Sequence, residues 1–212
     1  MKKYSAYLFD LDGTLVDSEK LKGKALAETC ILLGGKADVC IYKTVMGESW
    51  EHVADHFFKK AQIQPDMEEF NAEFRKIYAE LLLKELSPNP NIEGLLIRLK
   101  KTEKKIGLVS SASYWMVDQV LSQLELSHFF EIIIAKEHVT KHKPDPEAYF
   151  LALEKLSLPS SEVLIFEDSN PGLIAAERAG CDSVAFSHEF NIKHDLSSAV
   201  QTITDFNEIF ID

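Results

Sequence analysis

Hydrophobic and polar positions along this chain form two alternating patterns. Short apolar runs are separated, in the second half of the chain, by stretches with apolar residues at helical spacing. Such alternation predicts βαβ units, and therefore an α/β fold with a parallel sheet. The predicted strands are Tyr4–Phe9, Ile106–Val109, Glu131–Ala135, Val163–Phe166 and Ser183–Phe186, with Val200–Ile203 as an edge strand. The predicted helices are Asn91–Lys101, Trp115–Leu124, Pro146–Leu156 and Pro171–Ala179, with a short one at Asp205–Ile209.

The long interval between the first two strands breaks this alternation, because it shows helical faces and no strand pattern. One face carries Trp50, Val53, Ala54, Phe57, Phe58 and Ala61, and another carries Phe70, Phe74, Ile77 and Leu81. The sequence Ser-Pro-Asn-Pro at 87–90 ends any helix. Residues 16–87 are therefore predicted to form a helical insert, and residues 1–15 and 88–212 the core that contains the sheet. We expect the aromatic faces to pack inside the insert rather than bind a ligand.

Composition and charge narrow the class of protein. The chain has 212 residues, with 46% hydrophobic and 27% charged content, which is ordinary for a globular protein of this size. No apolar stretch approaches the ~20 residues of a membrane span, and no leader pattern is present, so no membrane partner and a cytoplasmic location are expected. The net charge of −11 disfavours nucleic acid as a partner. This size is compatible with a monomer. The cysteines, Cys30, Cys40 and Cys181, lack the spacing of a zinc site or a disulfide framework.

Two carboxylates, Asp10 and Asp12, follow the first predicted strand. On a strand, positions i and i+2 face the same way, so both can converge just past the carboxyl end, where open α/β sheets bind ligands. Two negative charges that lie so near each other need a neighbouring cation or a shared proton. The pair suits a metal-assisted phosphoryl transfer, in which one carboxylate attacks and the other handles the proton. A solvated surface turn is the alternative for the pair taken alone.

Three further segments lie at or just beyond strand ends, in chain order. Ser110 follows the second strand, and its hydroxyl can hold phosphoryl oxygens together with the backbone N–H groups of the next turn. Lys143, stiffened by Pro144, can neutralise a carboxylate and a phosphoryl oxygen together. Glu167 and Asp168 offer the oxygen ligands that Mg²⁺ prefers. Taken singly, helix caps and a solvated loop lysine are the alternatives.

Together these segments resemble the motifs of the haloacid dehalogenase superfamily. The matching residues are Asp10-Leu11-Asp12-Gly13-Thr14, Ser110, Lys143-Pro144 and Glu167-Asp168-Ser169. The insert looks like the helical cap domain of the family's first subclass, and residues 166–176 resemble the branch of β-phosphoglucomutases and sugar phosphatases. The resemblance implies a Rossmann-like parallel core, Mg²⁺ as the cofactor and an aspartyl-phosphate intermediate.

The resemblance also implies a role for each motif residue. Asp10 would be the nucleophile, and Asp12 would protonate the leaving oxygen and then deprotonate the attacking water. The metal site would comprise Asp10, the backbone carbonyl of Asp12, and Asp168, with Glu167 nearby. The residues expected to grip the phosphoryl group are Ser110, Ser111 and Lys143.

In this family the cap selects the substrate. The segment that contains Gly47, Glu48 and Trp50 looks like the cap loop that approaches the substrate, and Arg75 and Lys76 lie on a second amphipathic cap helix. In the family's mutases an arginine near the position of Trp50 binds a distal phosphate. An indole cannot do so, and Glu48 would repel the phosphate. Arg75 and Lys76 can compensate, with a solvated helix face as the alternative for both. His142 stands where the family has a small residue, and it is expected to be a bystander at the loop rim or to line the substrate mouth.

These patterns predict a Mg²⁺-dependent phosphatase of a small phosphorylated metabolite, with a sugar phosphate first among the candidates. Asp12 favours phosphoryl chemistry over dehalogenation, because a halide needs no proton on leaving. Two alternatives stay open. One is a sugar-phosphate mutase of the β-phosphoglucomutase type, and the other is a catalytically idle module that binds a phosphorylated metabolite.

Overall fold

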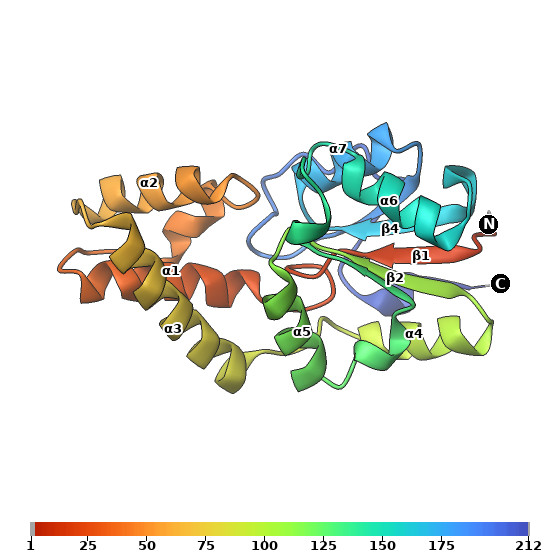
Figure 1. Cartoon of the computed structure of the whole chain (residues 1–212), viewed down its shortest axis with the longest axis horizontal. Coiled ribbons are helices and arrows are strands. Elements are labelled where there is room, and N and C mark those ends of the chain that lie inside the picture. Colours follow the sequence, from red (N-terminus) through yellow and green to blue (C-terminus); the bar gives the residue numbers. More distant parts are fainter. Residues whose placement is uncertain (1–2, 212) are drawn as a thin grey trace. The chain divides into compact units, whose positions relative to one another are not determined.

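The computed structural model describes residues 3–211, and the chain divides into two compact units (Figure 1). One unit comprises residues 1–16 and 88–212, and the other comprises residues 17–87. The first contains a sheet, whereas the described residues of the second form only helices and turns. No helix within residues 3–211 is long and apolar enough to cross a membrane.

The sheet has six parallel strands in the order β3-β2-β1-β4-β5-β6. Their bounds are Ala6–Phe9 (β1), Lys105–Val109 (β2), Ile132–Ile134 (β3), Val163–Glu167 (β4), Asp182–Phe186 (β5) and Gln201–Ile203 (β6). Central β1 pairs with β2 on one side and β4 on the other, with Phe9 opposite both Leu108 and Phe166. The carboxyl ends therefore share one edge of the sheet. The predicted α/β fold with a parallel Rossmann-like sheet is confirmed.

Helices cover both faces of this sheet, with α6 and α7 on one side and α4 on the other (Figure 1). Their bounds are Ile92–Lys101 (α4), Tyr114–Gln123 (α5), Glu147–Leu156 (α6) and Asn170–Arg178 (α7). Short 3₁₀ turns lie at Ser127–Phe129, Lys136–His138, Ser160–Glu162 and Phe206–Glu208. The start of α7 has a local cause, because Ser169 Oγ accepts a hydrogen bond from the backbone N–H of Gly172. Gly180 follows its end with a φ of +75°.

Two cores fix the strands, one on each face of the sheet. Leu8 points into an aliphatic core that also contains Tyr149 of α6. Phe9 points to the opposite face, where its ring stacks on Phe166 with 4.6 Å between centroids. Phe206 closes this aromatic cluster at 5.6 Å from Phe166. Because all five side chains are buried, the residues that follow β1 and β4 have little freedom to move.

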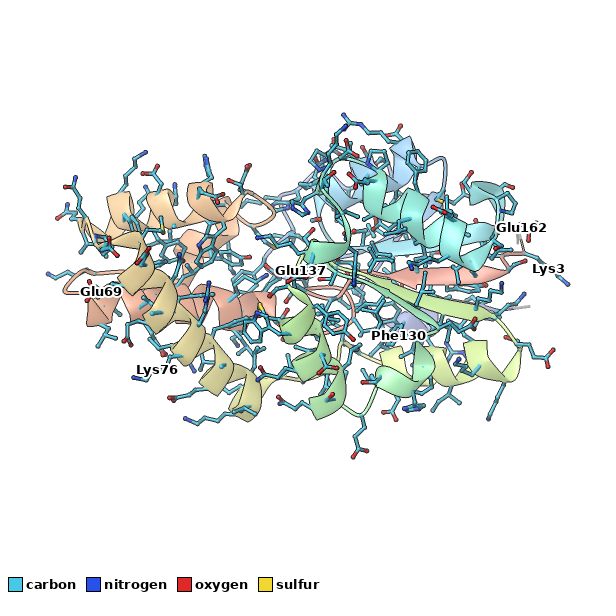
Figure 2. The ribbon with its side chains drawn as sticks, viewed as in Figure 1. Lys3, Glu69, Lys76, Phe130, Glu137 and Glu162 are labelled. Atoms are coloured by element: carbon cyan, nitrogen blue, oxygen red, sulfur yellow. The ribbon has the colours of Figure 1, made fainter. Side chains whose placement is uncertain are left out.

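The helical unit contains α1 (Glu19–Leu32), a 3₁₀ turn at Val39–Thr44, α2 (Trp50–Ala61) and α3 (Met67–Glu85). Its aromatic faces form its core, since Phe57 and Phe70 are completely buried. The indole N–H of Trp50 donates to Asn71 Oδ1 at 2.8 Å. Polar residues of α3 such as Lys76 extend into solvent (Figure 2).

Candidate active site

Three segments that are far apart in the sequence meet at the carboxyl edge of the sheet. Lys143 Nζ lies 2.5 Å from Asp10 Oδ1 and 2.6 Å from Glu167 Oε1, and it donates to the carbonyl of Val109 at 2.9 Å. Asp10 follows β1, Glu167 ends β4, and Lys143 lies in the loop before α6. The lysine and glutamate side chains are 7% and 0% exposed. The ammonium group is therefore buried between two carboxylates.

Burial and charge shift the protonation equilibria of this group. Desolvation raises the pKa of Asp10 well above its ordinary value, the neighbouring Glu167 and Asp168 raise it further, and Lys143 opposes them. Burial by itself would lower the pKa of Lys143, but Asp10 and Glu167 raise it above its ordinary value. The lysine therefore remains a cation between the two carboxylates.

Three carboxylates form a potential cation site. Asp10, Glu167 and Asp168 each offer an oxygen, and these oxygens all lie within 4.8 Å of one another. All three residues are buried, and their hard oxygen donors match the preference of Mg²⁺. The residues present thus fit the ion that the sequence predicts. Asp12 remains predicted to contribute through its backbone carbonyl.

Glu167 is held by three neighbours besides Lys143. The hydroxyl of Tyr149 donates to Glu167 Oε1 at 2.5 Å, and Ser169 Oγ donates to Oε2 at 3.3 Å. Gly172 approaches so closely that a Cβ there would lie 2.0 Å from Oε2. Burial, followed by the charges of Glu167 and Asp10, raises the pKa of Tyr149 well above its ordinary value. Nothing in the sequence marks Tyr149 as part of the site, because a tyrosine on an apolar helix face is typical of an ordinary core residue.

Asp168 is held by the segment that follows β5. His188 Nε2 lies 3.0 Å from Asp168 Oδ2, and Asn191 Nδ2 donates to the Asp168 carbonyl at 2.7 Å. Thr14 Oγ1 lies farther away, 3.5 Å from Asp168 Oδ1. Nothing in the sequence marks His188 and Asn191, since their segment has no periodic pattern and no short motif.

A buried asparagine holds the turn that carries Asp12. Gly13 in this turn has a φ of +77°, a conformation that favours glycine. Asn89 Nδ2 donates to the carbonyls of Gly13 and Thr14 at 2.9 and 2.8 Å. The Asn-Pro sequence at 89–90 was recognisable as a helix breaker, but its contact with this turn was not.

Ser110 lies at the same edge of the sheet, directly after β2. It is buried, its N–H donates to the carbonyl of Ile134, and its Oγ accepts from the N–H of Ala112 at 3.0 Å. The N-cap of α5 is Ser113, so Ser110 is not the helix cap. Ser111 and His142 are exposed.

The predicted substrate contacts in the helical unit form two groups, one before and at the start of α2 and one on α3. Gly47 and Glu48 are exposed, and Trp50 is half-buried. Arg75 and Lys76 are exposed on α3, with Lys76 Nζ 3.9 Å from Glu73 Oε2. Their contact with a substrate stays a prediction.

Known proteins share this architecture. A family model described as haloacid dehalogenase-like hydrolase matches residues 7–186. A phosphorylated carbohydrates phosphatase from Thermotoga maritima is 29% identical over 196 residues, which cover 91% of this chain and 87% of that protein. Fructose-1-phosphate phosphatase YqaB from Escherichia coli is 26% identical over 183 residues, covering 86% and 96%. The crystal structure of CbbY from Rhodobacter sphaeroides in complex with phosphate has a TM-score of 0.84 at 25% identity, covering 97% and 96%.

Proposed function

The chain belongs to the haloacid dehalogenase-like hydrolases, and on this premise we propose that it is a Mg²⁺-dependent phosphatase of a small phosphorylated metabolite, foremost a sugar phosphate. One observation carries the proposal. The ammonium of Lys143 lies between the carboxylates of Asp10 and Glu167, with an Asp168 oxygen within 4.8 Å of theirs. Hydrolysis of phosphate esters needs such charge compensation more than elaborate covalent chemistry. The two phosphatases named above support the same class of substrate.

In the first half of the proposed reaction, a carboxylate oxygen of Asp10 attacks the phosphorus atom of the ester. A bond forms between this oxygen and phosphorus, and the bond from phosphorus to the leaving oxygen breaks. Asp12 gives its proton to the leaving oxygen, which departs as an alcohol. Lys143 and the Ser110 hydroxyl bind the phosphoryl oxygens. When bound, Mg²⁺ supplies positive charge that favours the ionised form of Asp10 and offsets charge on the phosphoryl group.

In the second half, a water molecule attacks the phosphorus atom of the aspartyl-phosphate. Asp12 accepts a proton from this water, so the same side chain serves as acid and then as base. The bond between phosphorus and Asp10 breaks, inorganic phosphate leaves, and both aspartates return to their starting state. The Lys143 ammonium compensates the negative charge in both halves.

The helical unit, residues 17–87, is proposed as the cap that selects the substrate. Its candidate contacts are Gly47, Glu48, Trp50, Arg75 and Lys76. Trp50 is poorly suited to bind a phosphate, because its N–H donates to Asn71 within the same unit, and the Glu48 carboxylate would repel one. A second phosphate on the substrate would therefore depend on Arg75 and Lys76.

Phosphate release from a panel of sugar phosphates, nucleotides and phosphoglycolate tests the proposal, with Mg²⁺ or with EDTA. We expect Mg²⁺-dependent release from a narrow group of esters. Asp10→Asn should lower kcat on the order of 10⁴-fold or more and leave the circular dichroism spectrum unchanged. Asp118→Asn, on the exposed side of α5, is the matched control. Release that persists in EDTA or in Asp10→Asn would overturn the mechanism, and isomerisation of glucose 1-phosphate without release would favour the mutase.

A further inference from the structure

We propose that His188 is a positioning residue of the cation site, because it fixes the orientation of the Asp168 carboxylate. The inference rests on the proposed Mg²⁺-dependent function and concerns a residue outside the motifs that the sequence indicates. His188 Nε2 lies 3.0 Å from Asp168 Oδ2, and the two side chains are only 15% and 4% exposed. The contact is therefore largely shielded from water. A hydrogen bond to a carboxylate is strong in such an environment.

The backbone determines which nitrogen of His188 carries the proton. The N–H of Phe190 donates to His188 Nδ1 at 3.2 Å. A ring nitrogen that accepts a hydrogen bond carries no proton, so the neutral ring has its proton on Nε2. His188 Nε2–H is thus the donor to Asp168 Oδ2. The imidazole acts as an oriented donor beside the carboxylates.

A second side chain holds His188 in place. Asn191 is completely buried, and its Oδ1 accepts from the backbone N–H of His188 at 2.8 Å. Its Nδ2 donates to the carbonyls of Asp168 and Phe186, at 2.7 and 2.8 Å. One amide therefore ties the backbone of His188 to the backbone of Asp168, the residue whose carboxylate the imidazole contacts. The ring and the carboxylate belong to one braced unit.

These contacts restrict the rotation of the Asp168 carboxylate, which a bound cation would otherwise have to restrict itself. An aspartate carboxylate can rotate about its last torsion, and a bond from His188 to Oδ2 selects one orientation. Hydrogen-bond partners behind a metal ligand typically change metal affinity by 10- to 100-fold. Asp168 shares its site with the carboxylates of Asp10 and Glu167, and a donor on its Oδ2 also lowers their mutual repulsion.

Cation binding to the wild type and to two variants tests the inference. Mg²⁺ affinity is measured by isothermal titration calorimetry and Mn²⁺ affinity by electron paramagnetic resonance, both on metal-free protein. His188→Leu removes the donor and should weaken binding by about 10- to 100-fold. His188→Gln supplies an amide N–H in its place and should recover most of the affinity. His52→Leu, at an exposed position of α2, should bind like the wild type.

The outcomes separate this inference from the proposed function. A wild type that binds Mg²⁺ and a leucine variant that binds it equally well would overturn only the role of His188. Equal losses in the leucine and glutamine variants would indicate packing rather than hydrogen bonding, and would overturn it too. A wild type without Mg²⁺ affinity would overturn the proposed function and this inference together. Long-range ¹⁵N–¹H spectra of the wild type need no variant, and a His188 ring protonated on Nδ1 would contradict the hydrogen bond.

Discussion

Gly172 lies against Glu167 so closely that a Cβ atom on the glycine would fall 2.0 Å from Glu167 Oε2. The contact comes from the sharp return of the chain where β4 ends and α7 begins. Since Glu167 is 0% exposed and bonded to Lys143 and Tyr149, its carboxylate has no room to move away. Glycine at position 172 is therefore required by the position of the glutamate, and not by the backbone conformation.

We expect Gly172→Ala to displace the Glu167 carboxylate and to weaken its contact with Lys143. Overpacking of this kind lowers the free energy of unfolding by about 1–3 kcal/mol, which urea denaturation measures. Gly94→Ala is the control, because a Cβ at Gly94 on α4 would meet only Arg98 Nη1 at 3.6 Å. Alanine there should be neutral or slightly stabilising. Equal effects of the two substitutions would show that Glu167 is free to shift.

Tyr149→Phe should destabilise the protein by about 1.5–3 kcal/mol, because it removes a buried hydrogen bond to Glu167. Phenylalanine retains the ring, whose centroid lies 5.3 Å from Lys143 Nζ, so the loss reports on the hydroxyl. Thermal and chemical unfolding measure the difference. Tyr114→Phe, at a 46% exposed position, is expected to change stability by much less. A Tyr149 variant as stable as the wild type would contradict the importance of this bond.

The site residues that directly follow a strand can be predicted from the sequence. Apolar runs identify β1 and β4, and the residues just beyond them, Asp10 and Asp168, fall at one edge because parallel strands end together. Tyr149 and His188 were not accessible in the same way. Each acts through a single long-range contact, and neither a helical period nor a short motif marks a residue for that reason. Their roles become visible only when the partner carboxylates are placed.

The helix α1 shows a similar limit in the helical unit. Its buried residues include Leu21, Ala25, Leu26 and Cys30, with Gly23 among them. They do not fall on one stripe, because several sides of this helix are covered. A helix without a single apolar face has no strong periodic pattern. By contrast, α2 and α3 each bury one aromatic stripe, and sequence periodicity predicts both.

Lys143→Met should leave Asp10 and Glu167 as adjacent buried carboxylates without a cation. Removal of one partner from a buried ion pair costs about 3–5 kcal/mol, and the loss should shrink at acidic pH, where protonation of Asp10 relieves the repulsion. Lys141→Met in the same loop is the control, because Lys141 is exposed and lies 3.9 Å from Asp145 Oδ2. Added Mg²⁺ should restore part of the stability of Lys143→Met. A Lys143 variant as stable as Lys141→Met at neutral pH would contradict the buried ion pair.

Glu147→Gln should give a pH-dependent loss of stability, because Glu147 ties the loop of Lys143 to the start of α6. Its carboxylate accepts from the backbone N–H groups of Thr140 and Lys141, and these bonds lower its pKa below the ordinary value of 4.5. A carboxylate with a lowered pKa stabilises the fold above its unfolded pKa, and this contribution disappears as pH falls through the lowered value. The melting temperature of the variant should therefore lie below that of the wild type at pH 7 and approach it toward pH 3. Glu154→Gln, exposed on the same helix, should have the melting temperature of the wild type at every pH. A difference between Glu147→Gln and the wild type that stays constant with pH would exclude the Glu147 carboxylate as its cause.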